Sequence, residues 1–262
     1  MRRALAGMVL SLLCAGPVAA DVCTILADAG TGAILVRDGT VCDRRAPPQS
    51  TFKLPLALMG FDSGILLDAH TPRRDYRPDY GGVREVEKTA HDPASWQAVS
   101  VVWYSQQLTR RLGAERFAAY VSAFGYGNRN LAGDPGRNNG LARAWLSSSL
   151  RISPDEQIAF LLALRARTLP VSAHAYAMTD AAVPRFRAGD WQVQGKTGSG
   201  WLRGGDGKLD KSRPLGWFVG WARRSGREIV FARLLLENRP LDMPASFLAR
   251  DGLLADLPRL AD

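Results

Sequence analysis

A short polar turn near residue 50 leads into a stretch of the chain that is almost wholly apolar. Its apolar members are Leu54, Leu56, Ala57, Leu58, Met59 and Phe61. A helix without a polar face is buried on every side, so this one should run through the middle of a domain. Pro47-Pro48 imposes an extended approach, and Pro55 is tolerated only in the first turn, where its missing N–H has no intrahelical partner. The helix is therefore predicted to begin at or just after Ser50.

The head of this helix places a hydroxyl and an amine three residues apart, at Ser50 and Lys53. In α or 3₁₀ geometry the side chains at i and i+3 share a face, so the two groups can come within hydrogen-bond distance. Such a pair could be a nucleophile and its base. A serine here could equally be a helix N-cap, and the S-x-x-K pattern often arises by chance, so the pair alone leaves both interpretations open.

The N-terminal segment has the pattern of an export signal. Arg2 and Arg3 precede an apolar run over 4–13, and small residues over 18–20 come before the first acid of the chain. We predict that residues 1–20 are a cleaved secretory signal and that the protein is exported to the periplasm.

The mature chain is then predicted to be a single catalytic domain over 21–262, which is long enough for a substantial core. Cys14 is preceded by two leucines rather than by the small residue that a lipoprotein signal needs, so lipidation is not expected. No later stretch supplies the roughly 18 consecutive apolar residues of a membrane span, and we expect no membrane association.

Charge and cysteine usage narrow the function classes. The formal net charge is +9, but the basic residues are scattered and lack the glycine-aromatic interleaving of an RNA-binding sheet, so nucleic-acid binding is not expected. Cys23 and Cys42 remain after signal removal, and an even count in an exported chain favours a disulfide. The histidines His70, His91 and His174 are far apart, so no metal site is predicted.

Hydrophobic periodicity divides the mature chain into two parts. The predicted strands are 23–27, 33–37, 191–196, 216–221 and 229–236, and the predicted helices after the first are 96–112, 116–124, 157–167 and 245–254, with a surface excursion over 71–93 and a loop over 128–139. We therefore predict an α/β (α+β) fold in which residues 21–61 and 176–262 form an antiparallel sheet flanked by helices. Residues from roughly 62 to 175 should form an all-helical lobe.

Further clusters accompany the S-x-x-K pair, and each alone has an ordinary structural explanation. A small serine can pack within a helix, an asparagine can form a turn, and a lysine can end an exposed strand. Their joint occurrence in this order, with an export signal, is very improbable by chance. The clusters are Ser100-Val101-Val102, Tyr126-Gly127-Asn128 and Lys196-Thr197-Gly198.

With these clusters the chain resembles a class D β-lactamase, the serine-dependent oxacillinase group within the penicillin-recognising enzymes. S-x-x-K and K-T-G belong to that whole superfamily, and the resemblance implies its serine β-lactamase/transpeptidase-like fold over nearly the whole mature chain. The class D assignment depends on Ser100-Val101-Val102 followed by Trp103 and on Tyr126-Gly127-Asn128. It depends also on Ala144-Trp145-Leu146 leading into Leu150-Arg151-Ile152-Ser153-Pro154, and on Gly216-Trp217-Phe218-Val219-Gly220-Trp221.

The resemblance implies hydrolysis of the β-lactam amide bond of penicillins and related antibiotics, which gives resistance. Ser50 would attack the carbonyl, and Lys53, carboxylated by carbon dioxide or bicarbonate to a carbamate, would serve as the base for acylation and deacylation. Ser100 would pass a proton to the lactam nitrogen, with Lys196 tuning it, and Trp145 would donate its indole N–H to the carbamate. Carbon dioxide apart, no cofactor is implied.

The substrate-binding residues carried over by the same resemblance surround this centre. Val102 and Leu146 would form an apolar wall, and Thr197, with Gly198 beside it in the motif, would hold the substrate carboxylate. The backbone N–H groups of Ser50 and Ser199 would meet the oxyanion. Tyr126, Gly127 and Asn128 are carried over as a structural motif.

Two departures from the family pattern leave the shape of the substrate pocket and the identity of the carboxylate clamp undecided. Many members have an aromatic residue directly after K-T-G, where this chain has Ser199. Family members usually have an arginine at the start of the last helix that clamps the substrate carboxylate. At the corresponding position this chain has Leu248, and Arg250 lies about 200° round the helix from it. Arg250, Thr197, Ser199 or an arginine of the 201–213 loop could be the clamp.

Other readings of the same motifs remain. A penicillin-binding DD-peptidase shares S-x-x-K and K-T-G, but the context of Trp145 and Ser100-Val101-Val102 argues against it. A β-lactam sensor domain acylates without turnover, and it needs a membrane anchor and a signalling partner, which we do not expect here. The substrate range is open, and so is the choice between monomer and homodimer.

Overall fold

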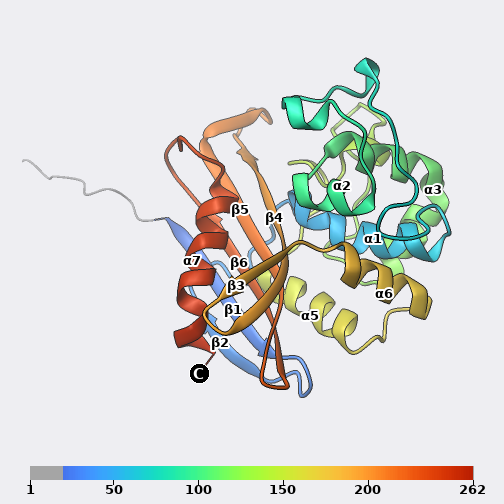
Figure 1. Cartoon of the computed structure of the whole chain (residues 1–262). Coiled ribbons are helices and arrows are strands. Elements are labelled where there is room, and N and C mark those ends of the chain that lie inside the picture. Colours follow the sequence, from blue (N-terminus) through green and yellow to red (C-terminus); the bar gives the residue numbers. More distant parts are fainter. Residues whose placement is uncertain (1–19, 262) are drawn as a thin grey trace, which may run out of the picture.

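A six-stranded antiparallel sheet forms one side of the molecule in the computed structural model, which describes residues 20–261 (Figure 1). The strand order is β2-β1-β6-β5-β4-β3. The strands are β1 (Asp21–Asp28), β2 (Ile34–Asp38), β3 (Arg185–Ala188), β4 (Trp191–Arg203), β5 (Leu209–Arg224) and β6 (Arg227–Leu236). The antiparallel architecture expected from the sequence is confirmed. The predicted secretory signal lies, except for residue 20, outside the described residues.

The prediction of five strands was wrong by one, because β3 was missed. This strand has only four residues, and Arg185 and Arg187 are exposed on either side of the partly buried Phe186. Its alternation of polar and apolar residues covers only four positions, which is too short to identify a strand. Pairing with β4 makes it a strand, since a tight turn through Gly189 and Asp190 folds it back onto that neighbour.

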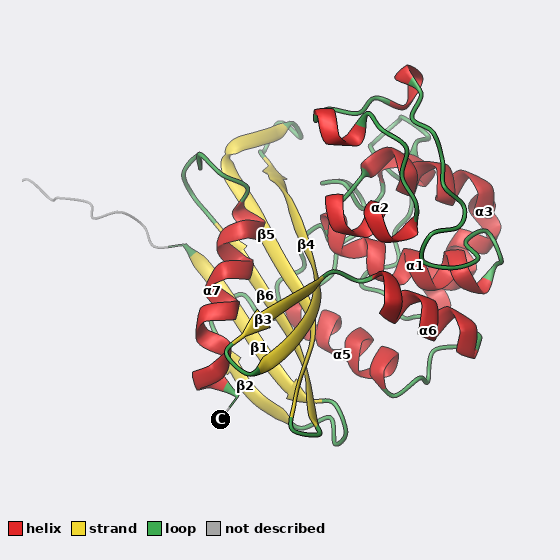
Figure 2. Cartoon of the chain, viewed as in Figure 1, coloured by secondary structure: helices red, strands yellow, loops and turns green. Residues whose placement is uncertain are grey.

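The helices lie on both faces of the sheet, with α7 on one face and the others on the opposite side (Figures 1 and 2). Their bounds are α1 (Lys53–Asp62), α2 (Pro93–Val99), α3 (Val102–Ala123), α4 (Gly140–Arg143), α5 (Pro154–Arg165), α6 (Ala173–Ala182) and α7 (Ala245–Leu260), with short 3₁₀ helices η1 (Gln49–Phe52), η2 (Pro78–Tyr80) and η3 (Glu85–Glu87). Every residue of α1 before Asp62 is buried, as the apolar run predicted. This helix packs between α3 and α6.

The helical region differs from the prediction in its boundaries. The predicted helix over 96–112 is broken at Ser100, whose left-handed backbone (φ 64°) ends α2 before α3 begins. The predicted break before Arg116 is a single non-helical residue, Gly113, inside α3. Helices α4 and α6 were not predicted: one has four residues, and the other is an alanine-rich segment without a clear polar face.

Helix α7 is longer than its predicted span of 245–254 and contains Pro258. A proline near a helix end removes one hydrogen bond, and burial of the flanking apolar residues offsets that loss. Leu257 and Ala261, at 0% and 2% exposure, pack against the sheet here. At the other end of α7, Gly216 of β5 approaches so closely that an added Cβ would lie 2.2 Å from Ala245.

The sheet separates two hydrophobic cores. The larger core lies between the sheet and the helices on the face opposite α7, and it includes α1 together with Phe52, Trp145 and Trp217. The smaller core lies between the sheet and α7 and includes Phe218 and Leu253. Within the described residues, no helix combines the length and apolar character needed to cross a bilayer.

A disulfide joins Cys23 of β1 to Cys42, with the Cα atoms 5.2 Å apart, as the sequence predicted. Both cysteines are buried. The bond attaches the N-terminal hairpin to the segment that continues through Pro47 and Pro48 into η1. It therefore connects the second strand of the sheet to the segment that leads into the central helix.

This bond predicts a stability difference. Replacing both cysteines by alanine should lower the free energy of unfolding by about 3 kcal/mol, because a closed loop with a separation of 19 residues restricts the unfolded chain. Urea unfolding of the wild type and the double variant measures the difference, and mass spectrometry of the non-reduced mature protein should find no free thiol. Two titratable thiols in the wild type would contradict the bond.

Candidate active site

The Ser50 hydroxyl and the Lys53 amine meet at the junction of η1 and α1. Lys53 Nζ lies 3.1 Å from Ser50 Oγ, within hydrogen-bond distance. The 3₁₀ turn that contains Ser50 runs directly into α1, so the side chains three residues apart share a face. Ser50 is partly exposed and Lys53 is 1% exposed. An accessible hydroxyl therefore has a dry amine behind it.

Several contacts fix the turn around Ser50. Gln49 has a left-handed backbone (φ 52°), which costs a non-glycine residue about 1 kcal/mol or more. Its N–H donates to Trp145 O at 3.0 Å, and its side chain donates to Ser147. On the other side, Thr51 Oγ1 donates to Pro48 O at 2.7 Å. These bonds hold the strained turn in one conformation.

Burial determines the charge state of Lys53. Desolvation is the main cause that lowers its pKa well below the ordinary lysine value, and the positive charge of Lys196 is the second. The ring of Phe52, its neighbour in the chain, stacks on Trp145 with centroids 5.4 Å apart. The Trp145 indole N–H is buried and has no hydrogen-bond partner among the described residues. The ring that stacks on the chain neighbour of Lys53 therefore carries a buried donor without a partner among the described residues.

Lys196 enters the same region from β4. It is 2% exposed, and its Nζ lies 3.1 Å from Thr197 O. Burial, followed by the charge of Arg84, lowers its pKa to about 7. Two buried lysines, of which Lys196 lowers the pKa of Lys53, would be costly as an ammonium pair in a dry site. At neutral pH the site therefore favours at least one neutral amine.

The free edge of β4 faces the nucleophile. In the part of β4 that does not pair with β3, the Gly195 N–H donates to Pro184 O and the Trp201 carbonyl accepts from the Ser147 hydroxyl. The backbone groups of the odd-numbered β4 residues therefore point away from β5. By the two-residue period, the Ser199 N–H lies on this edge as well. At Gly198 an added Cβ would lie 3.1 Å from Ser50 N, which shows how closely the strand approaches η1.

Ser100 and Val102 flank the reversal between α2 and α3. Ser100 is partly exposed, and its backbone N–H bonds to Trp96 O as the C-cap of α2. Val101 is fully buried, and its N–H bonds to the same carbonyl at 3.2 Å. Val102 is the partly exposed first residue of α3. Because the left-handed residue forces a sharp turn, the serine projects from a corner rather than from a helix face.

The Tyr126-Gly127-Asn128 motif supports the loop that carries Trp145 and the partly exposed Leu146. Tyr126 packs edge-on against Phe52, with ring centroids 5.4 Å apart. Gly127 has φ 55°, and an added Cβ would lie 2.1 Å from Arg151 O. Asn128 accepts from Arg151 N–H and donates to Ser149 O, both at 2.9 Å. The motif has structural contacts of the kind the resemblance implied.

Arg250 has partners on the α7 side of the sheet. Its Nε lies 2.7 Å from the Asp251 carboxylate, and its guanidinium lies over the rings of Phe247 and Phe186 at 4.7 and 5.8 Å. The first turn of α7 is tied to β4 by a bond of 2.7 Å between Ser199 Oγ and Ser246 Oγ. No contact of Arg250 with Ser50 or Lys53 is present, so its role as a carboxylate clamp stays a prediction.

Two charged residues near the site, Arg84 and Glu87, lie in the segment 71–93 that was predicted to be a surface excursion. Figure 2 shows that the segment between α1 and α2 is mostly loop. Glu87 is nevertheless buried, and Arg84 lowers the pKa of both Lys53 and Lys196. No periodic pattern in the segment could have revealed this, because a short 3₁₀ turn buries Glu87 and sets the half-exposed Arg84 side chain against it.

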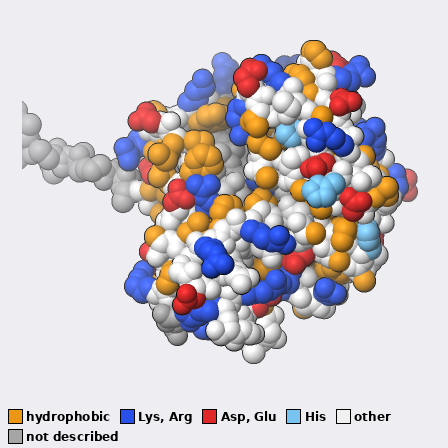
Figure 3. Space-filling model, viewed as in Figure 1, with side chains coloured by type: hydrophobic (Ala, Val, Ile, Leu, Met, Phe, Trp, Pro, Cys, Tyr) orange, Lys and Arg blue, Asp and Glu red, His pale blue; other side chains and the backbone are white. Residues whose placement is uncertain are grey.

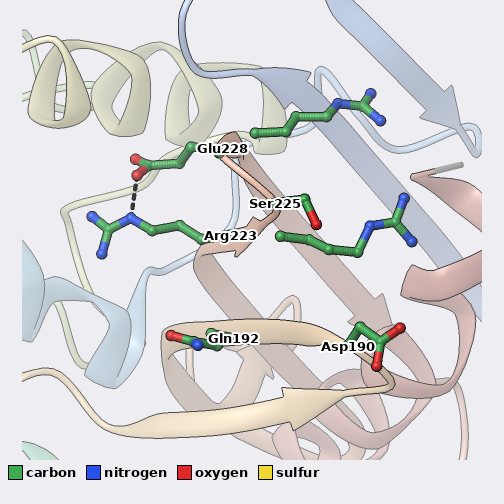
Figure 4. Close-up of a pocket in the computed structure, with 8 residues that line it drawn as sticks. Asp190, Gln192, Arg223, Ser225 and Glu228 are labelled. Carbon is green, nitrogen blue, oxygen red and sulfur yellow. Dashed lines mark hydrogen bonds and ion pairs between the residues drawn. The ribbon is translucent and has the colours of Figure 1, made fainter.

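Two hollows help to locate the site. One, of about 430 Å³, borders Ser199 and has mostly apolar walls that include Trp201, Pro214 and Met243. Figure 3 shows hydrophobic side chains over the neighbouring ends of β5 and α7, beside a hollow in the surface. The other lies at the turns that join β3 to β4 and β5 to β6, where Arg223 points toward Glu228 (Figure 4). None of the predicted site residues lines that second hollow.

Comparison with known proteins agrees with this geometry. Residues 22–251 match the penicillin binding protein transpeptidase domain family, which establishes the general class of fold and site. The β-lactamase OXA-9 of Klebsiella pneumoniae is 52% identical over 91% of this chain and 87% of its own length, and OXA-1 of Escherichia coli is 34% identical over 91% and 84%.

Among solved structures, the class D β-lactamase OXA-427 superposes with a TM-score of 0.86 at 42% identity, covering 92% of this chain and 98% of its own. The chain belongs to the class D β-lactamase family. The resemblance read from the motifs is thereby confirmed.

The approach of β4 to η1 predicts the effect of one methyl group. Gly198→Ala would place Cβ 2.8 Å from Pro48 O, so the strand must move away from Ser50. We expect kcat/KM for a β-lactam to fall about 100-fold, as for other small misplacements of catalytic groups. Gly205→Ala, in the hairpin with open space around it, is the matched control and should keep wild-type activity. Equal activity of the two variants would contradict this packing.

Proposed function

We propose that this protein hydrolyses the β-lactam amide bond of penicillins through an acyl-enzyme on Ser50. The observation that carries the proposal is the 3.1 Å contact between Lys53 Nζ and the accessible Ser50 hydroxyl in a chain of the class D family. A serine hydroxyl becomes a nucleophile when an adjacent base takes its proton, and an amine kept neutral by burial can accept one.

In the acylation step, Ser50 Oγ adds to the lactam carbonyl and transfers its proton to the base. The developing oxyanion is stabilised by the Ser50 and Ser199 N–H groups; the position of Gly198 beside Ser50 N supports this pairing. The C–N bond then breaks, and Ser100 passes a proton to the leaving nitrogen. Lys196 tunes that transfer, with a pKa of about 7 that suits proton exchange near neutrality.

The residues present fit a carboxylated Lys53. Burial keeps its amine neutral, which is the form that captures carbon dioxide, and the unpaired indole N–H of Trp145 is a donor in need of an acceptor. When bound to Nζ as a carbamate, carbon dioxide supplies an anionic base beside Ser50. Trp145 would hold it by hydrogen bonding, while Phe52 and the neighbouring loop exclude water.

The substrate carboxylate is assigned to Thr197 on β4, next to Lys196, with Arg250 as a further candidate. The walls for the substrate side chain are assigned to Val102 and Leu146, both of which are partly exposed. Export to the periplasm would bring the enzyme to its antibiotics before they reach their targets, and it suits the Cys23–Cys42 bond.

A first experiment tests the nucleophile and the base. Mixing the wild type with a chromogenic cephalosporin should give continuous product formation, whereas a single burst would indicate a DD-peptidase or a sensor. Ser50→Ala should abolish acylation. Lys53→Ala should lower kcat by about 10²- to 10⁴-fold, the usual contribution of a base. Normal steady-state hydrolysis by Ser50→Ala would refute the nucleophile assignment.

A second experiment tests the state of Lys53. As pH falls through its lowered pKa, the amine becomes protonated and cannot hold carbon dioxide, so progress curves in degassed, mildly acidic buffer should slow with time. Added bicarbonate should restore the rate, and Trp145→Ala or Trp145→Phe should deepen the dependence.

Trp191→Phe is the matched control, because it also removes a buried indole N–H without a partner among the described residues, but from the core beside α7. Its bicarbonate dependence should equal that of the wild type. Full activity without bicarbonate at every pH, with Lys53 unmodified by carbon-13 labelling, would show that another group is the base.

A further inference from the structure

Arg84 lies in a loop that contains none of the family motifs, and its side chain contacts the residue before Ser100. Its Nε and Nη2 lie 2.8 and 2.6 Å from Glu87 Oε1, and Nη2 also donates to Val99 O at 2.5 Å. Val99 is the last residue of α2 and directly precedes Ser100. The guanidinium therefore bridges a carboxylate of its own loop and the carbonyl next to the proposed proton-transfer serine.

Glu87 anchors this guanidinium from behind. Its side chain is only 8% exposed, and its second oxygen accepts the Val83 N–H at 2.9 Å. Its backbone carbonyl accepts the indole N–H of Trp103 at 2.7 Å, and Trp103 is buried in α3. A surface arginine normally samples many rotamers. Here the buried Glu87 carboxylate and a two-point contact hold the Arg84 guanidinium in one place.

The contact with Val99 stabilises the corner that presents Ser100. The last carbonyls of a helix lack intrahelical partners and form the negative end of its dipole, so a guanidinium is a favourable partner there. Ser100 has a left-handed backbone that a residue with a side chain rarely adopts. A fixed donor on the preceding carbonyl favours this conformation over an extended alternative.

The charge of Arg84 acts on the two buried amines. It is the second cause, after burial, that lowers the pKa of Lys196, and it also lowers that of Lys53. Three charged groups act on Lys53, namely Lys196, Glu87 and Arg84, and only Glu87 favours its charged form. Arg84 is the charged group that acts on Lys196. Since half of the Arg84 side chain is exposed, water screens its charge and the effect on each amine is modest.

We propose that Arg84 is a positioning residue for β-lactam hydrolysis: it fixes the Ser100 corner through its hydrogen bond to the Val99 carbonyl and keeps a positive charge at that corner. The proposal rests on the function proposed above, in which these side chains do the chemistry. It assigns to the loop between α1 and α2 a role that the family motifs do not include.

The test compares Arg84→Gln and Arg84→Lys with the wild type. Steady-state kcat and KM are measured across pH in saturating bicarbonate, with the melting temperature of each variant recorded. Arg84→Gln should lower kcat about tenfold and move the acidic limb of the profile upward by up to about one pH unit, because loss of the cation favours the protonated amines. Arg84→Lys should keep the wild-type limb and still lose kcat, because an ammonium cannot form the two-point contact.

Arg77 provides the matched control. It lies in the same loop, and its side chain is exposed with its Nε 3.1 Å from Asp79. Arg77→Gln should leave kcat and the pH profile unchanged. A wild-type kcat and acidic limb in Arg84→Gln, or a loss of kcat with no movement of the limb, would overturn the proposal.

A different result would indicate failure of the proposed function itself. If the wild type does not turn over β-lactams, the comparison moves to the lysines, whose pKa values are read by NMR titration of carbon-13-labelled side chains. Higher pKa values for Lys53 and Lys196 in Arg84→Gln than in the wild type would support the electrostatic action of Arg84, and equal values would refute it. Should Arg84→Gln not fold, Arg84→Lys still tests the positioning role through kcat.

Discussion

Burial of two lysine amines side by side is the constraint on which the rest of the site depends. Lys53 comes from the central helix and Lys196 from the sheet, and each is almost inaccessible to solvent. Removing an ammonium from water is costly, and a second one nearby adds to that cost. The protein resolves the conflict by favouring the neutral amines. A neutral amine beside a serine is also the arrangement that nucleophilic chemistry needs, so a stability problem and a catalytic requirement have one solution.

Close packing between the two lobes creates this environment. The β4 edge approaches η1 so closely that Gly198 and Gly200 leave no room for a side chain, since an added Cβ at Gly200 would lie 2.2 Å from Gln49. The loop over 128–139 adds contacts between β4 and the helical part of the chain. Arg203 of β4 donates to Ser147 O at 2.7 Å and pairs with Asp134 of this loop, which also pairs with Arg143. The turn that carries Ser50 therefore cannot shift without disturbing strand, loop and helix together.

Much of this could be read from the sequence. The apolar run predicted a central helix, the two remaining cysteines predicted their disulfide, and the period-two segments predicted an antiparallel sheet. The S-x-x-K and K-T-G motifs lie close together, because Lys53 Nζ contacts Ser50 Oγ and Gly198 approaches Ser50 N. These features were visible because each depends on a local spacing: three residues for Ser50 and Lys53, two for the strands, or an uninterrupted apolar run for α1.

The features that the sequence left undecided depend on contacts between distant segments. Strand β3 is too short and too polar to be a strand without β4 beside it, and Ser100 becomes a corner only where α2 and α3 separate. Arg84 and Glu87 lie in a loop with no period, yet a buried indole from α3 and a carbonyl from α2 place them beside the Ser100 corner. The sequence by itself determined the central helix and the residues proposed as the reacting groups, because local geometry and residue chemistry follow from the order of residues along the chain. Only the tertiary structure decided which charges surround those groups, because desolvation and Coulomb interactions depend on distance in space and not on separation in sequence.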